Sequence, residues 1–354
     1  MQGTYCCKKR KDYDKMLALF EKRVIQELPP VHNLKIFRVP ITLMNPSTLE
    51  TEETFIHTHK LTGPGPEEAK KTKKTVVHIH GFGGSSATYQ PFLNNLSESY
   101  NVFGIDLLGM GCSGRPDIPW AKLTSSQVID TYVESIEQWR KHMKLEKLNL
   151  IGHSFGAYFS IFYTKKYTER VASLTLFSVP CATTEPERFK QKMKTMKLSF
   201  KRKMMYYFWT FMNKKYISGY TAFSSLPMKT ILNFWLKGRS DYTPAQKKVI
   251  VDFLAAQFWD RRFSSGIIPV LMGYRAYALE HPAFEEIPAI LKAGIKTRIF
   301  YGSKDWIDFR EVLFEIEKKG LDRDALLEVL EGSQHQMPLL EPERMAEVVK
   351  GFLG

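Results

Sequence analysis

Short, nearly continuous apolar runs recur along this chain and predict buried strands. Before residue 180 these runs cover residues 75–80, 102–106, 148–151 and 171–177. Residues 124–144, between the second and third runs, instead place apolar side chains three or four positions apart, which predicts a helix. Strands that alternate with helices are typical of a parallel, doubly wound sheet. We therefore predict an α/β fold with a mostly parallel central sheet flanked by helices.

The two ends of the chain continue these patterns. Residues 12–26 have apolar positions at helical spacing, and Pro29 and Pro30 stop the helix that they predict. Residues 34–39 and 53–58 alternate between apolar and polar side chains, as antiparallel strands do. After residue 288 the pattern predicts two further strands and a closing helix, at 297–301, 326–330 and 343–352.

Residues 181–288 interrupt this alternation, because they contain few strand-like runs and many Lys, Met and aromatic residues. We predict that they form a helical cap inserted over a candidate active site of the core. The expected organisation is therefore an N-terminal basic and amphipathic segment (1–30), the first part of the core (31–180), the cap, and the second part of the core (289–354).

The predicted cap combines basic and aromatic residues. An aromatic and Met-rich run covers 204–212, a similar stretch covers 234–239, and the basic residues before them are Lys190, Lys192, Lys194, Lys197, Lys201, Arg202 and Lys203. This mixture suits a membrane interface, where rings lie at headgroup depth and cations meet phosphates. An ordinary cap with buried rings and solvated lysines is the alternative. Single-stranded nucleic acid would suit the composition, but no nucleic-acid motif accompanies it.

Composition narrows the class of protein further. The chain has 354 residues, of which 44% are hydrophobic, enough for one large α/β domain with an insertion. The net charge of +14 favours an acidic partner surface, for which we expect an anionic membrane or a lipid droplet. Four cysteines without metal-binding spacing favour a reducing compartment. No apolar run reaches the roughly 18 residues that a membrane-spanning helix needs.

The first residues lack the apolar core of a secretory signal. Cys6 and Cys7 lie next to the basic residues 8–11, so that acylation of these cysteines would hold the chain at a membrane. A solvated N-terminus is the alternative. We expect a cytoplasmic protein that associates peripherally with membranes.

Ser154 lies at the centre of a Gly-x-Ser-x-Gly pattern, between the run at 148–151 and a helix-compatible stretch at 157–166. A nucleophilic serine needs a strained strand-to-helix turn, and Gly152 and Gly156 remove side chains that would collide there. The helix that follows directs N–H groups at the point where negative charge develops. Ser154 is therefore the candidate nucleophile, and an ordinary serine in a tight turn is the alternative.

A glycine-rich turn, His80-Gly81-Phe82-Gly83-Gly84, follows the run at 75–80. Its glycines allow backbone N–H groups to approach a ligand closely. We expect the N–H groups of Phe82 and Phe155 to form an oxyanion hole, and His80 to brace the turn.

Gly109, Gly111 and Gly114 match the spacing of a dinucleotide-binding fingerprint after a strand. Arg115 and Pro116 follow where a helix should already run, and no strand ending in an acidic residue lies at the expected distance. We interpret these glycines as a turn packed near the nucleophile loop, and we expect no cofactor and no metal.

A serine hydroxyl becomes a nucleophile when a histidine removes its proton and a carboxylate orients that histidine. Asp305 and His335 each follow a predicted strand, so both are expected with Ser154 at the carboxyl edge of one sheet. The order Ser, Asp, His predicts a catalytic triad of Ser154, Asp305 and His335. Asp308 is the second choice for the acid, because it lies only a short turn away.

With these motifs the chain resembles the α/β-hydrolase superfamily. More narrowly it resembles a lipid-acting subfamily that includes the lyso-N-acyl-phosphatidylethanolamine lipase, the coactivator of adipose triglyceride lipase, and lysophosphatidate acyltransferase-like proteins. The more specific matching stretches are Ser135-Ile136-Glu137-Gln138-Trp139 and the run at 301–308, which ends in Asp-Trp-Ile-Asp. The cap shows little resemblance.

The resemblance implies a serine hydrolase that cleaves acyl esters of phospholipids or lysophospholipids through an acyl-enzyme. A His-x-x-x-x-Asp motif linked to acyl transfer is altered, because Leu340 stands at its Asp position; this weakens the interpretation as a lysophosphatidate acyltransferase. Some coactivator members lack the nucleophile, so Ser154 favours hydrolysis. Two further functions stay open: a lipid-surface protein that regulates another lipase, and a peptidase or small-ester hydrolase of the same fold.

Overall fold

The computed structural model describes most of the chain. The described residues are 3–31, 33–64, 66, 72–187, 189–190, 200–215, 229–230, 232–233, 236, 242–260 and 262–354.

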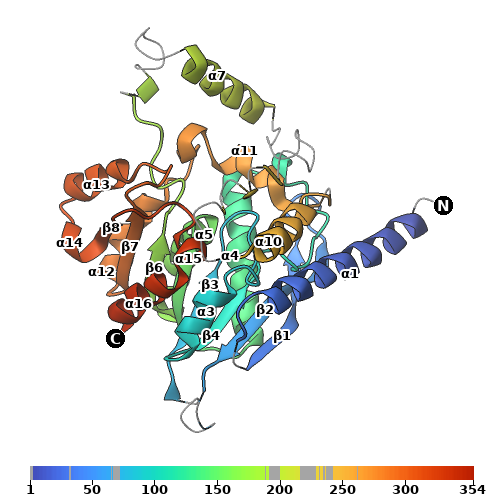
Figure 1. Cartoon of the computed structure of the whole chain (residues 1–354). Coiled ribbons are helices and arrows are strands. Elements are labelled where there is room, and N and C mark those ends of the chain that lie inside the picture. The colour runs from blue at the N-terminus through green and yellow to red at the C-terminus, as the bar shows by residue number, and fades with distance from the viewer. Residues whose placement is uncertain are drawn as a thin grey trace.

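An eight-stranded sheet forms the centre of the molecule, with the strand order β1-β2-β4-β3-β5-β6-β7-β8 (Figure 1). β1 pairs with β2 and β2 with β4 in antiparallel fashion, and every other pair is parallel. The strands are β1 (Leu34–Met44), β2 (Thr51–Thr62), β3 (Thr75–Ile79), β4 (Asn101–Ile105), β5 (Leu148–His153), β6 (Val171–Phe177), β7 (Lys296–Gly302) and β8 (Leu327–Leu330). The predicted α/β class, with a mostly parallel sheet and an antiparallel start, is confirmed.

Helices cover both faces of this sheet (Figure 1). The longer helices are α1 (Gly3–Glu27), α3 (Gln90–Ser97), α4 (Ser125–His142), α5 (Phe155–Lys166), α7 (Phe200–Lys214), α10 (Pro244–Gln257), α13 (Phe309–Lys318) and α16 (Pro342–Leu353). Short helices are α11 (Ile268–Leu271), α12 (Ile287–Lys292), α14 (Arg323–Leu326) and α15 (Met337–Leu340). Single 3-10 turns are η1 (Trp120–Lys122), η2 (Thr168–Arg170), η4 (Ser264–Ile267), η5 (Tyr274–Ala276) and η6 (Ala283–Glu286).

Neighbouring side chains of one strand enter different halves of the core, because successive residues of a strand point to opposite faces. Val77 of β3 packs in a cluster with residues of α4, α5, α12 and α13. Val76 packs in a second cluster with residues of α1, α3, α10 and α16. The sheet is therefore buried on both faces, which explains why its parallel strands appear in the sequence as continuous apolar runs.

The Ser-Ile-Glu-Gln-Trp stretch lies in α4 and contributes to this core. Trp139 is fully buried, and its indole N–H donates to Thr58 Oγ1 of β2 at 2.9 Å. The buried Glu137 carboxylate accepts from Arg140 at 2.8 Å and from the Tyr163 hydroxyl at 2.9 Å. This stretch therefore joins α4 to β2 and α5 and makes part of the scaffold.

The N-terminal helix α1 begins at Gly3, nine residues before the predicted start, and ends at Glu27, next to the predicted end. It lies against α10, where the Tyr13 hydroxyl donates to the carbonyl oxygen of Ala256 at 2.8 Å (Figure 1). Gln246 Nε2 donates to the carbonyl oxygen of Glu27 at 2.8 Å. Segments more than 200 residues apart are thus joined along one edge of the molecule.

Between residues 181 and 288 the described part of the chain consists of α7, α10, α11, the turns η4, η5 and η6, the first residues of α12, and isolated bridges. In Figure 1, α7 lies at the top of the molecule, beyond α11. The predicted division of the chain, with a helical cap at 181–288, stays a prediction.

Candidate active site

Ser154 occupies the turn between β5 and α5. Its backbone has a φ of 53° and a ψ of −123°, a conformation that non-glycine residues rarely adopt outside functional turns. A Cβ at Gly152 would lie 2.4 Å from the Cα of Ala157, and one at Gly156 would lie 2.1 Å from the carbonyl oxygen of Ile79. Both glycines are therefore required for the turn that presents the hydroxyl.

The structure brings the three residues of the predicted triad together. His335, which follows β8, has its Nε2 atom 3.1 Å from Ser154 Oγ. Asp305, which follows β7, has its Oδ1 atom 3.0 Å from His335 Nδ1. With Nδ1 protonated toward Asp305, the Nε2 atom accepts the hydrogen bond of the Ser154 hydroxyl. This arrangement allows the imidazole to take the proton of the serine.

The Asp305 carboxylate is surrounded by donors. The Ser178 hydroxyl donates to Oδ2 at 2.5 Å, and the Ile307 N–H donates to Oδ1 at 2.9 Å. Burial alone would raise the pKa of Asp305. The charge of His335 beside it and these hydrogen bonds outweigh burial and lower the pKa below its ordinary value. Asp305 is therefore an anion at neutral pH, which suits it to stabilise an imidazolium.

Asp308 occupies a different position. It caps the N-terminus of α13, where its carboxylate accepts from the Arg310 N–H at 3.2 Å. It also forms ion pairs with the guanidinium groups of Arg310 (2.7 Å) and Arg275 (3.8 Å). Of the two candidate acids, Asp305 is the one that is hydrogen-bonded to His335.

The glycine-rich turn after β3 lies against Ser154. A Cβ at Gly81 would be 2.9 Å from the Cβ of Ser154, so the backbone of this turn approaches Ser154 as closely as sterics permit. Phe82 is the next residue, and its ring lies 6.1 Å from that of Phe155, the first residue of α5. The N–H groups in the first turn of a helix have no acceptor within that helix, which suits Phe155 to the role expected of it.

His80 is fully buried beneath this turn. Its Nδ1 atom donates to the carbonyl oxygen of Gly81 at 2.7 Å, and its Nε2 atom accepts from the Leu107 N–H at 2.9 Å. Burial lowers the pKa of His80, which keeps the ring neutral and fixes this pattern. The contacts fit the bracing role expected from the sequence. The nearby glycine-rich turn at 107–114 contacts the same loop, because Met110 Sδ accepts from the Gly83 N–H at 3.5 Å.

Three polar residues, His153, Tyr89 and Ser178, adjoin the site, and the sequence did not point to their roles. His153 Nδ1 accepts from the Tyr89 hydroxyl at 3.0 Å, and His153 Nε2 donates to the carbonyl oxygen of His335 at 2.8 Å. Burial lowers the pKa of His153 to about 3, so the ring is neutral. His153 lies within the Gly-x-Ser-x-Gly pattern and could have been noticed there. Nothing local marks Tyr89 or Ser178, which arrive from other parts of the fold.

A largely apolar pocket opens above Ser154. Phe82, Trp306 and Leu339 of the core line the pocket. Leu254, Ile268 and Met272 of the 181–288 segment also line it. The Trp306 ring lies 5.0 Å from that of His335 and is half exposed. The pocket can therefore bury the apolar part of a ligand beside Ser154.

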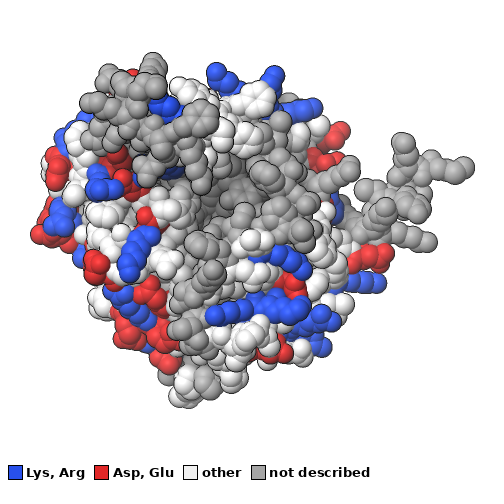
Figure 2. Space-filling view, turned by 45° about the horizontal axis from the view of Figure 1, so that its top comes forward, with Lys and Arg blue, Asp and Glu red and all other residues white. Residues whose placement is uncertain are grey.

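The helix α7 exposes large apolar side chains to solvent. Met204, Met205, Tyr207, Phe208 and Phe211 are each at least 50% exposed. On the face shown in Figure 2, Lys and Arg side chains are interspersed with Asp and Glu. No helix in the described part of the chain is long and apolar enough to cross a membrane.

Several residues of the lipid-contact prediction lie outside the described residues. These are residues 192, 194, 197, 234, 235 and 237–239, together with the side chains of Lys201, Arg202, Cys6 and Cys7. The membrane contacts expected of them stay predictions.

Ser154 lies on a strand-to-helix turn and is followed in chain order by Asp305 and His335, which is the order of these residue types in α/β hydrolases. Residues 74–342 match the family described as alpha/beta hydrolase fold. The chain belongs to this family, as its motifs implied.

The curated relatives include proteins named for lipid chemistry. "Abhydrolase domain-containing protein abhd-5.2" of Caenorhabditis elegans is 33% identical over 160 residues, which are 45% of this chain and 33% of that protein. "(Lyso)-N-acylphosphatidylethanolamine lipase" of Mus musculus is 34% identical over 128 residues, 35% and 36% of the two chains. "1-acylglycerol-3-phosphate O-acyltransferase" of Arabidopsis thaliana is 25% identical over 255 residues, 69% and 58% of the two chains. In each case the match spans less than two thirds of the relative's length. The names of these relatives confirm the predicted resemblance to the lipid-acting subfamily.

Solved structures agree on the fold. The carboxylesterase CesB from Bacillus subtilis has a TM-score of 0.62 at 16% identity, covering 97% of this chain and 98% of its own. A bacterial membrane phospholipase A has a TM-score of 0.55 at 19% identity, covering 97% and 91%. At such identities the likeness establishes the shared fold alone.

Proposed function

We propose that the chain is a serine hydrolase that cleaves acyl esters of phospholipids or lysophospholipids. The observation that carries this proposal is the placement of Ser154 Oγ 3.1 Å from His335 Nε2, with Asp305 on the far side of the imidazole and an apolar pocket above. The lipid chemistry in the names of the mouse and plant relatives supports the substrate class.

The first half of the reaction forms an acyl-enzyme. His335 Nε2 removes the proton of Ser154, and the serine oxygen attacks the acyl carbonyl carbon. The N–H groups of Phe82 and Phe155 stabilise the oxyanion of the tetrahedral intermediate. His335 then donates its proton to the departing glycerol oxygen, and the carbon–oxygen bond of the ester breaks.

The second half returns the enzyme to its starting state. His335 removes a proton from water, whose oxygen attacks the acyl carbonyl carbon of the Ser154 ester. The oxyanion forms again beside Phe82 and Phe155. When it collapses, His335 returns the proton to Ser154 and the fatty acid leaves. Asp305 stays ionised and stabilises the imidazolium in both halves.

The proposed substrate resides in a membrane or droplet surface, and α7 supplies a surface suited to it. The apolar face that contains Met204, Phe208 and Phe211 is exposed, while Lys203 and Lys214 lie on the same helix. Exposed rings beside lysines suit the interface of an anionic membrane. In this proposal residues 181–288 act as the cap, and the chain binds membranes peripherally from the cytoplasm.

Active-site labelling and product analysis test the hydrolase proposal. A fluorophosphonate probe should label the wild-type chain and leave Ser154→Ala unlabelled. A panel of phospholipid and lysophospholipid vesicles should release fatty acid with the wild type only. Labelling that persists in Ser154→Ala contradicts the assignment of the nucleophile. Turnover of soluble esters or peptides without any vesicle hydrolysis favours a small-ester hydrolase or a peptidase.

A lipid-surface protein that regulates another lipase is the second candidate, and the exposed face of α7 is the observation that favours it. This function predicts vesicle binding, and stimulation of a partner lipase that survives Ser154→Ala.

The same product analysis distinguishes acyl transfer from hydrolysis, because acyl transfer to lysophosphatidate from an acyl donor would give phosphatidate. Leu340 stands at the Asp position of the His-x-x-x-x-Asp motif that the resemblance links to acyl transfer, which argues against that outcome.

A further inference from the structure

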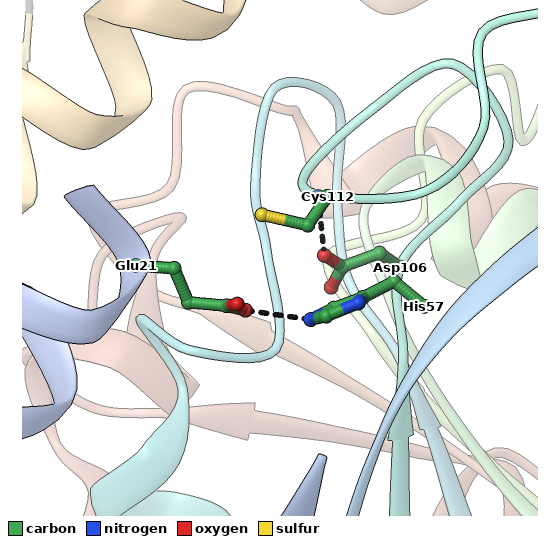
Figure 3. Close-up of side chains that lie close together, drawn as sticks. All are labelled: Glu21, His57, Asp106 and Cys112. Atoms are coloured by element: carbon green, nitrogen blue, oxygen red, sulfur yellow. Dashed lines mark hydrogen bonds and ion pairs between the residues drawn. The ribbon is translucent and has the colours of Figure 1, made fainter. Parts of the chain in front are cut away.

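A second cluster of buried chemical groups plays no part in the proposed hydrolysis. It consists of Glu21, His57, Asp106 and Cys112, and the four ligand-type atoms that they offer lie within 4.8 Å of one another (Figure 3). Glu21 comes from α1, His57 from β2, Asp106 follows β4, and Cys112 belongs to the glycine-rich turn at 107–114. All four are at least nine-tenths buried. Three separate segments of the chain therefore converge on one enclosed point.

The hydrogen bonds of the cluster leave ligand capacity unused. Glu21 Oε1 is bonded to His57 Nε2 and to His59 Nε2, each at 2.8 Å. Within the described part of the chain, the buried Nδ1 atom of His57 has no hydrogen-bond partner. Cys112 is a free, buried cysteine. An enclosed unpaired nitrogen is costly unless something occupies it.

Backbone contacts fix the positions of these groups. The His57 N–H donates to Ser113 Oγ at 2.8 Å, and the same hydroxyl donates to the carbonyl oxygen of Asp106 at 2.7 Å. A Cβ at Gly111 would lie 2.0 Å from Asp106 Oδ2, so only glycine lets the turn approach this carboxylate. The Cys112 N–H donates to that oxygen at 2.8 Å. The glycines that resemble a dinucleotide fingerprint thus serve to bring Cys112 beside Asp106 and His57.

We propose that Glu21, His57, Asp106 and Cys112 form a binding site for a divalent transition-metal ion of the Zn²⁺ type. A thiolate, an imidazole and carboxylates are the ligand types that zinc accepts in four-coordinate sites. Tetrahedral bonds of zinc place their ligand atoms roughly 3.5 Å apart. Atoms within 4.8 Å of one another reach this geometry by side-chain adjustments on the order of 1 Å.

His59 fits such a site as a residue that orients a ligand. It is fully buried, and its Nε2 atom lies 2.8 Å from Glu21 Oε1. Ligating carboxylates are commonly held by a hydrogen bond of this kind. The Ser86 N–H does the same for Asp106, donating to Oδ1 at 2.6 Å.

Metal binding at this point would join α1 to the sheet and to the turn after β4. A ligand that binds only the folded chain stabilises it by mass action. This metal site was not predicted from the sequence, where the cysteine spacing indicated no metal. The reason is that its four ligands come from positions spread over more than 90 residues. Such a set has no signature in a short sequence window.

Metal content of the full chain tests the proposal. The wild type is incubated with Zn²⁺ and a non-thiol reductant, dialysed against buffer, and analysed by elemental mass spectrometry. We expect about one zinc per chain for the wild type and for Cys181→Ser, a control that alters another buried free cysteine. Cys112→Ser and His57→Gln should each bind zinc at least tenfold more weakly.

Cobalt substitution gives a readout on the unmutated chain. Co²⁺ bound by Cys112 should produce the near-ultraviolet charge-transfer absorption of a thiolate–cobalt bond, and Zn²⁺ should remove it by displacement. Either cation should also raise the melting temperature of the wild type and not that of Cys112→Ser. A wild type without stoichiometric zinc, a cobalt complex without the thiolate band, or full zinc retention in both variants overturns the proposal, leaving a metal-free hydrogen-bonded junction.

Discussion

His153 Nε2 donates a hydrogen bond to the main-chain carbonyl oxygen of His335 at 2.8 Å. The residue before the candidate nucleophile therefore holds the backbone of the candidate general base. His153 ends β5 and His335 follows β8 of the same sheet, but the two are 182 residues apart in the chain. Because His153 is neutral and takes one fixed tautomer, its hydrogen bond to the His335 carbonyl oxygen helps to position the His335 ring beside Ser154.

Replacing His153 should slow the chemical step. His153→Phe keeps an aromatic ring but removes the donor to His335, so we expect kcat to fall roughly 10- to 100-fold with KM nearly unchanged, because small misplacement of a catalytic group is costly. Tyr89→Phe is the matched control. It removes the hydrogen bonds of the Tyr89 hydroxyl to His153 Nδ1 and to Gln336 Oε1 (3.4 Å) but keeps the donor to His335, so it should reduce kcat several-fold less. Equal losses in the two variants, or a loss confined to KM, would rule out this positioning role.

Substituting each of the two candidate acids in turn should distinguish their roles. Asp305→Asn removes the charge beside His335 and should lower kcat about 10³- to 10⁴-fold. Asp308→Asn leaves His335 in place and weakens the ion pairs with Arg310 and Arg275 and the cap of α13, so kcat should stay within a few-fold of wild type. Ester hydrolysis measured at saturating substrate distinguishes them. The opposite ranking would transfer the role of the acid to Asp308.

The sheet and the geometry of the candidate triad were largely predictable from the sequence. Strands buried on both faces appear as apolar runs, and residues that follow parallel strands gather at one sheet edge. Ser154, Asp305 and His335 all follow such runs, so their convergence required only the order of elements. The choice between Asp305 and Asp308 was less secure, because both adjoin the end of one strand.

Contacts between distant segments could not be predicted in the same way. Ser178 and Tyr89 reach the site through packing that leaves no local pattern. The Ser-Ile-Glu-Gln-Trp stretch suggested a specific subfamily, but the buried positions of Glu137 and Trp139 give it a role in the scaffold. Sequence matching detects such residues and does not by itself separate scaffold from site.

Removing the exposed rings of α7 should weaken membrane contact. Phe208→Ser combined with Phe211→Ser takes two half-exposed side chains from the surface. We expect binding to anionic phospholipid vesicles to fall at least tenfold, because burying one Phe side chain contributes roughly 1.5–3 kcal/mol. Hydrolysis of a soluble short-chain ester should be unchanged.

The matched control for α7 is Leu49→Ser, which removes an exposed apolar residue from the connection between β1 and β2. Vesicle co-sedimentation should be unaffected by this change. If the control weakens binding as much as the α7 double substitution, the contact is non-specific. If neither variant weakens binding, α7 is not the membrane-facing element.

The buried imidazole of His78 should make the fold sensitive to acid. Neither ring nitrogen has a hydrogen-bond partner within the described residues, and burial lowers its pKa well below the ordinary value. Below about pH 6.5 the unfolded chain binds a proton here that the folded chain does not, so the free energy of unfolding falls by up to about 1.4 kcal/mol per pH unit. His78→Leu should therefore lose about 2 kcal/mol less than wild type between pH 7.5 and 5, as measured by urea unfolding. The control His142→Gln replaces an exposed histidine, and its free energy of unfolding should fall with pH as that of the wild type does. Equal losses of stability in the wild type and both variants would refute the role of His78.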